Sequence, residues 1–197
     1  MMIFKPPPTA CFVYIALPGA SELVTAARFE LMERSGIPLG RLIYGKSYLD
    51  RADAVPFDPV ELKLAPRVYE TTVMQGIFGA LRDAAPDSWG RRVIERRVGR
   101  SPLTELEYLL EAPDDRAGAL AFGLDAKPPA AQRRFTQTIL LAKLQAIADA
   151  IVADKDLPTD PDVSQAEELL LIGTSMGGAR PKAVVEDGGD LWIAKFN

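Results

Sequence analysis

The 197-residue sequence contains no histidine and only one cysteine. Without an imidazole, Ser-His and Cys-His nucleophile pairs are excluded, and so are the usual zinc sites, which need imidazoles or several thiolates. A single cysteine also excludes an internal disulfide, and Cys11 lies in an apolar run where a buried, inert thiol is expected. Hydrolase and zinc chemistries are therefore not expected.

Long apolar runs and a positive net charge are also missing. The longest apolar runs fall far short of the roughly 20 residues that a membrane-spanning helix needs, and no basic-then-apolar signal segment opens the sequence. A net charge of −4 argues against a protein that wraps nucleic acid with its whole surface. We therefore expect a cytoplasmic protein with no membrane partner.

The first third of the sequence alternates apolar and polar residues with period two, which predicts strands. Turn-forming stretches at Pro18-Gly19, Ser35-Gly36 and 56–66 separate them, so a small antiparallel meander with one buried face is expected. The alternating sets are Phe12, Tyr14 and Ala16, then Ala27, Phe29 and Leu31, then Leu42 and Tyr44.

From residue 74 the apolar period becomes helical. Ile77, Phe78 and Leu81 fit one helix, and 87–98 fits a second, with Pro86 at its start. A third helix is expected to open with Ser101 as its cap and Pro102 in its first turn, followed by a short strand over 117–122.

The later part of the chain contains two breaks. Residues 127–134 form the best linker candidate, and 154–162 form a second break. An amphipathic helix is expected between them, with a further helix over 164–172; its stripe is Ile139, Leu140, Lys143, Leu144, Ile147 and Ile151. We therefore expect three parts, 1–126, 127–162 and 163–197, in an α+β fold whose N-terminal subdomain is an antiparallel sheet with helices.

A glycine-rich loop at 173–178 precedes two short apolar segments joined by Asp187-Gly188-Gly189-Asp190. Gly-Gly at the centre of a tight turn predicts a hairpin, because both central residues of a type I′ turn need a positive φ. The register then places Val184 opposite Ile193.

The same register brings Lys182 opposite Lys195. Two lysines directly opposite repel, unless an anion lies between them, and the nearby aliphatic pair suits a flat ring. This outline fits a nucleotide site. A plain hairpin with solvated lysines remains an alternative, because the loop matches neither a Walker A motif nor G-x-G-x-x-G.

Five segments, in order, resemble HipA-family kinases, the toxins of bacterial toxin–antitoxin pairs. They are GRLIYGKSYL at 40–49, RDAAPDSWGR at 82–91, DRAGAL at 115–120, SMGGARPK at 175–182 and WIAKF at 192–196. The resemblance spans about residues 40 to 196. It implies the start of a protein-kinase-like N-lobe after the N-terminal subdomain.

The resemblance also implies ATP and Mg²⁺ as cofactors of an intact serine/threonine kinase. Gly177 and Gly178 would cover the phosphates and Lys195 would bind them. Ser175 matches the position where the family can autophosphorylate; capping of the loop backbone by Ser175 is the alternative. The implied cofactor-binding set is Ser175, Met176, Gly177, Gly178, Ala179, Lys182, Val184, Ile193 and Lys195.

Phosphoryl transfer also needs a catalytic aspartate and metal ligands, which this sequence does not supply after Lys195. We therefore expect no catalytic residue, no metal site and no turnover in the chain alone. By family resemblance, the partners are a HipB-like helix-turn-helix antitoxin and a protein substrate such as an aminoacyl-tRNA synthetase. A non-enzymatic module that docks such an antitoxin is the alternative function.

A basic run lies on the second expected helix and just after it. Its members are Arg91, Arg92, Arg96, Arg97 and Arg100. DNA would be reached mainly through the antitoxin, with weak direct contact through Arg91, Arg92, Arg96 and Arg97. A solvated helix face is the alternative interpretation of this run, and Trp89 beside it is expected to anchor the core.

Overall fold

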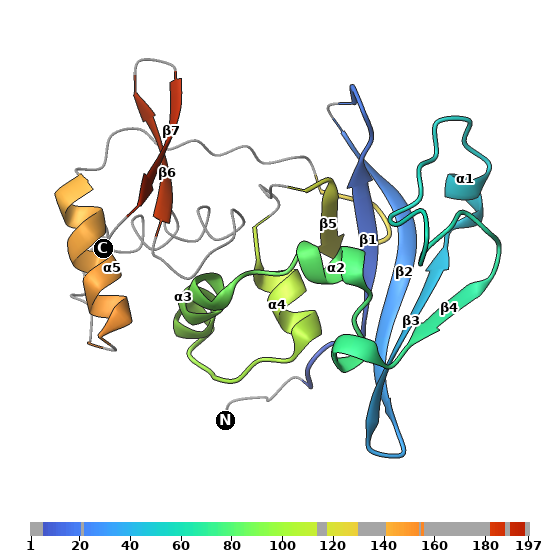
Figure 1. Ribbon diagram of the computed structural model, residues 1–197, viewed down its shortest axis with the longest axis horizontal. Helices are drawn as coiled ribbons and strands as arrows, with labels where there is room; N and C mark the ends of the chain where they lie inside the picture. Colours follow the sequence, from blue (N-terminus) through green and yellow to red (C-terminus); the bar gives the residue numbers. More distant parts are fainter. Residues whose placement is uncertain are drawn as a thin grey trace. The chain divides into compact units, whose positions relative to one another are not determined.

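The computed structural model describes residues 6–20, 22–113, 118–129, 141–153, 155, 182–187 and 190–195. These residues form an α+β protein with a five-stranded antiparallel sheet, several helices and a separate two-stranded hairpin (Figure 1). The α+β expectation is thereby confirmed at this level.

The chain divides into two compact units that interleave in sequence. The first contains Met1–Ala85, Thr104–Leu110 and Gly118–Ala131, and the second contains Pro86–Leu103, Glu111–Ala117 and Gln132–Asn197. The domain boundaries expected after residues 126 and 162 stay predictions, and residue 162 lies outside the described residues.

The sheet of the first unit has the strand order β4-β3-β2-β1-β5. Its strands are β1 (Ala10–Ala16), β2 (Leu23–Arg34), β3 (Ile37–Tyr44), β4 (Val68–Thr71) and β5 (Leu120–Gly123). The predicted meander is confirmed in β1 to β3, and the strand predicted over 117–122 is found as β5, which pairs with β1. Far-separated segments of the chain therefore complete one sheet.

The core side of β1 is not the expected set of Phe12, Tyr14 and Ala16. Cys11, Val13 and Ile15 alternate regularly and join the core cluster, whereas Ala16 is exposed. Tyr14 is buried as well, and its hydroxyl donates to the Asp125 carbonyl. The irregular pairing between Val13 and Tyr14 leaves Ala26 of β2 without an opposite residue, so the bulge lies in β2.

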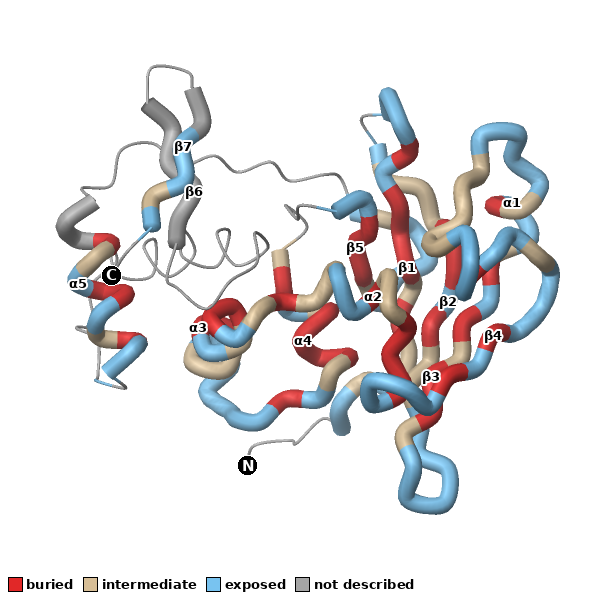
Figure 2. The backbone as a smooth tube through the Cα atoms, viewed as in Figure 1, coloured by how far each residue is buried: buried red, intermediate tan, exposed pale blue. Residues whose placement is uncertain are grey.

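Two short helices bury their apolar side chains in the core of the sheet. They are α2 (Gly79–Asp83) and α4 (Glu105–Glu111), and Leu81, Leu106 and Leu109 belong to the same buried cluster as Phe29 of β2. Buried residues follow β1, β2 and β3 in Figure 2, whereas the β2–β3 turn is exposed. Burial of this apolar surface stabilises the unit.

Helices α2 and α4 both begin later in the chain than the sequence predicts. Helix α2 begins at Gly79, so Ile77 and Phe78 are buried before the helix rather than within it. Helix α4 begins after Thr104 rather than at Ser101 and Pro102: the Thr104 hydroxyl accepts from the Glu107 N–H, and the Glu107 carboxylate accepts from the Thr104 N–H. This reciprocal capping box fixes the helix start in place of the expected serine cap.

Tyrosines of β3 and of α1 (Lys46–Leu49) hold the irregular segment after α1. The Tyr44 hydroxyl donates to the Leu62 carbonyl at 2.8 Å and accepts from the Phe57 N–H. The Tyr48 hydroxyl donates to the Val55 carbonyl and accepts from the Val55 N–H. Burial raises the pKa of Tyr44 to about 12. Buried hydroxyls thus satisfy the backbone of a segment that has little regular structure.

In the second unit, α3 (Ser88–Val98) is capped at both ends. The Asp87 carboxylate accepts from the Gly90 N–H at 2.8 Å, so Asp87 is the cap and Pro86 lies before the helix, not in its first turn. At the other end, Gly99 adopts a left-handed conformation with φ of 70°.

Helix α5 (Leu141–Val152) and the hairpin of β6 (Lys182–Asp187) and β7 (Asp190–Lys195) also belong to the second unit. The expected apolar stripe of α5 is confirmed at Leu144, Ile147 and Ile151, which are buried. The first two residues of the expected stripe, Ile139 and Leu140, lie outside the described residues. The helix expected over 164–172 lies outside them as well.

Candidate functional site

The candidate nucleotide site is centred on the β6–β7 hairpin. Its two strands are antiparallel, and the register pairs Lys182 with Lys195, Val184 with Ile193, and Asp187 with Asp190. This is the register that the sequence predicts. Residues directly opposite in an antiparallel pair lie on the same face, so Lys182, Val184, Ile193 and Lys195 occupy positions on one face of the hairpin.

The described side chains of β7 are largely exposed. Trp192 is 59% exposed and Ile193 is 52% exposed, and Lys195 is also exposed. An isolated two-stranded ribbon buries little of its own surface. The hairpin therefore presents an apolar side chain and an ammonium group from alternate positions of one strand.

Part of the expected site lies outside the described residues. This applies to Ser175, Met176, Gly177, Gly178 and Ala179 of the loop, and to the Gly188-Gly189 turn. At Lys182 and Val184 the structure describes the backbone, so these two enter the site by register alone. The assignment of all nine residues to ATP stays a prediction.

The chemistry available at the hairpin is electrostatic. Two lysine positions directly opposite one another would place like charges close together, which destabilises a sheet by up to about 1 kcal/mol per pair. An oxyanion between them would convert the repulsion into two charge-assisted interactions. A site of this kind can hold and neutralise phosphate, and Ile193 offers an apolar surface beside it.

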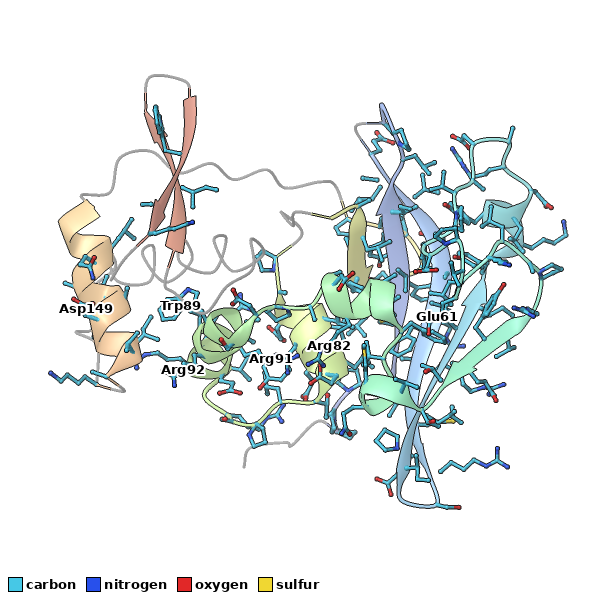
Figure 3. All side chains as sticks on the ribbon, viewed as in Figure 1. Glu61, Arg82, Trp89, Arg91, Arg92 and Asp149 are labelled. Carbon is cyan, nitrogen blue, oxygen red and sulfur yellow. The ribbon has the colours of Figure 1, made fainter. Side chains whose placement is uncertain are left out.

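The arginine run separates into different environments. Arg97 donates to the Glu111 carboxylate at 2.7 Å, and Arg91 donates to the Pro86 carbonyl. Arg92, Arg96 and Arg100 instead line one cavity. Figure 3 shows Arg91 and Arg92 leaving α3 on different sides. Arg92, Arg96 and Arg100 follow one another at intervals of four residues, and this spacing could have set them apart from Arg91 and Arg97 by sequence alone.

Trp89 of α3 is buried, with 2% of its surface exposed, which confirms the expected core role. Its indole N–H has no hydrogen-bond partner in the described part of the chain. A buried unpaired donor is costly, so the fit of the apolar ring must outweigh that cost here.

Metal ligands and membrane spans were both sought in the described residues. No cluster of three or more histidine, cysteine, aspartate or glutamate side chains there could hold a metal ion. Among the same residues, no helix combines the length and the apolar character that crossing a bilayer requires.

The comparisons with known proteins add no relative. The sequence matches no protein-family model and no curated protein, and the fold matches no solved structure.

Proposed function

We propose that this chain is the N-terminal part of a HipA-like ATP-dependent serine/threonine protein kinase, and that it binds ATP phosphates through its glycine-rich loop and Lys195. The observation that supports the proposal most is the β6–β7 register, which pairs Lys182 with Lys195. Five sequence segments in family order also support it.

The physical basis of the proposal is charge. ATP carries a compact set of phosphate oxygens, and backbone N–H groups of a glycine-rich turn together with lysines are suited to bind them. Mg²⁺ would arrive with the phosphates and neutralise part of their charge. Val184 and Ile193, paired in the same register, would contact the base.

The intact protein would transfer the γ-phosphoryl group to a protein hydroxyl. Family resemblance makes an aminoacyl-tRNA synthetase a candidate substrate, a HipB-like helix-turn-helix antitoxin a candidate partner, and Ser175 a candidate autophosphorylation site. Docking of the antitoxin by a non-enzymatic module is the alternative function, and it requires no nucleotide binding.

Calorimetric titration with a non-hydrolysable ATP analogue and Mg²⁺ tests the proposal. We expect binding by the wild type and a loss of about tenfold or more in Lys195→Ala, the scale of one charge-assisted hydrogen bond. Lys46→Ala is the matched control, because Lys46 is an exposed lysine paired with Asp50 in the first unit. Absence of wild-type binding, or equal affinity in Lys195→Ala, would contradict the nucleotide site.

A further inference from the structure

A cavity of about 520 Å³ lies in the second unit beside the C-terminal end of α3. Its lining includes three arginines from the α3 side, Arg92, Arg96 and Arg100, and Ile151 and Val152 from α5. Its size falls in the range of small-molecule sites, roughly 300–1,000 Å³. Figure 3 shows Arg92 on the side of α3 nearest α5.

The backbone explains why these arginines converge. Arg92 and Arg96 are four residues apart, so they lie on the same side of α3, about 6 Å apart along its axis. The left-handed Gly99 then ends the helix, and the N–H groups of Gly99 and Arg100 both donate to the Glu95 carbonyl. This closure fixes the position of Arg100 just past the last turn.

The partners of the arginines differ. Arg96 donates to the Lys155 carbonyl, which orients its guanidinium at the cavity. Arg92 is exposed and has no ion pair or hydrogen bond in the described residues, whereas Arg97 on the same helix is paired with Glu111. Arg92 thus brings five N–H donors that no described group accepts.

We propose that this cavity binds a small molecule that carries at least one phosphate group, held by Arg92, Arg96 and Arg100. Planar guanidinium groups match phosphate oxygens in bidentate geometry, and the oxygens of a phosphate or diphosphate can accept from several of them at once. Ile151 and Val152 supply an apolar wall for the rest of the ligand.

Two features oppose an anion at this position. The C-terminal end of a helix carries a partial negative charge, and Glu95 contributes a carboxylate to the lining. The bonded carbonyl of Glu95 reduces the first effect, and three guanidinium groups against one carboxylate outweigh the second. The same helix end would favour arginines for stability alone, and that explanation predicts no ligand.

Titration of the full chain with inorganic pyrophosphate at low salt separates these explanations. We expect measurable binding by the wild type that weakens about tenfold in Arg92→Ala and less in Arg92→Lys, because lysine keeps the charge but loses the fork. Glu95→Gln is expected to bind more tightly. Arg97→Ala is the matched control on the same helix, and it should bind like the wild type.

Lys195→Ala should retain pyrophosphate binding at this cavity, so failure of the hairpin site and failure of this one are distinguishable. In that variant, tighter binding of ADP than of pyrophosphate identifies an organic ligand that contacts the apolar wall, and equal binding identifies recognition of the phosphates alone. No wild-type binding at millimolar pyrophosphate, or equal losses in Arg92→Ala and Arg97→Ala, overturns the proposal.

Discussion

Gly40 of β3 and Gly76 of η1 (Val73–Gly76) approach each other so closely that neither has room for a side chain. A Cβ built on Gly40 would lie 1.8 Å from the Gly76 carbonyl oxygen. Gly76 follows Met74 and Gln75, and all three have a positive φ, which is strained for the two side-chain residues. The contact of η1 with β3 therefore depends on a glycine at position 40.

Replacing Gly40 with alanine should destabilise the first unit. The new Cβ would force backbone atoms apart, and we expect a loss of about 1–3 kcal/mol in the free energy of unfolding. Gly45→Ala is the matched control: its φ is −66° and its nearest neighbour to a new Cβ is 3.7 Å away. Urea denaturation followed by circular dichroism measures both. Equal midpoints for the two variants would show that η1 moves away from β3 without cost.

At the scale of elements, capping residues determine where the short helices begin. Helix α4 has seven residues, too few to be stable by propensity alone. Its capping box and its apolar contacts to the sheet therefore maintain it. An ion pair at 2.8 Å between Arg82 of α2 and Glu105 of α4 adds a smaller surface contribution.

Thr104→Ala should lower the stability of the first unit by about 1 kcal/mol, because it removes the acceptor for the Glu107 N–H. Ser101→Ala should have little effect, although the sequence pattern favours Ser101 as the cap. The midpoints of urea unfolding compare the two variants directly. A larger loss in Ser101→Ala than in Thr104→Ala would reverse the assignment of the cap.

At the scale of the whole molecule, regular patterns predicted the elements, and local chemistry decided their details. The strands β1 to β3, the stripe of α5 and the β6–β7 register follow from apolar spacing and a Gly-Gly turn. The bulge at Ala26 of β2, opposite Val13 and Tyr14, could not be predicted, because it depends on the long-range pairing of β2 with β1. The pairing of β5 with β1 is likewise a long-range contact that spacing does not encode.

Of the two candidate sites, the hairpin site could be predicted from the sequence and the arginine-lined cavity could not. Register counting from the sequence placed Lys182 opposite Lys195, whereas the cavity at Arg92 depends on α5, which follows α3 by more than 40 residues. The four-residue spacing of Arg92, Arg96 and Arg100 could have indicated a common side of the helix, but only the fold supplies the second wall. The nucleotide assignment rests on sequence resemblance together with the hairpin register.

The central claim, that phosphates of ATP lie beside Lys195 and Lys182, is tested most directly by lysine labelling with an ATP acyl phosphate. This reagent transfers its acyl group to an amine beside the bound phosphates and releases ATP. We predict acylation of Lys195 or Lys182, suppressed by excess ATP with Mg²⁺, and no such protection at Lys46 or Lys63. ATP-protected labelling at other lysines only, or labelling of the hairpin that ATP does not suppress, would contradict the account.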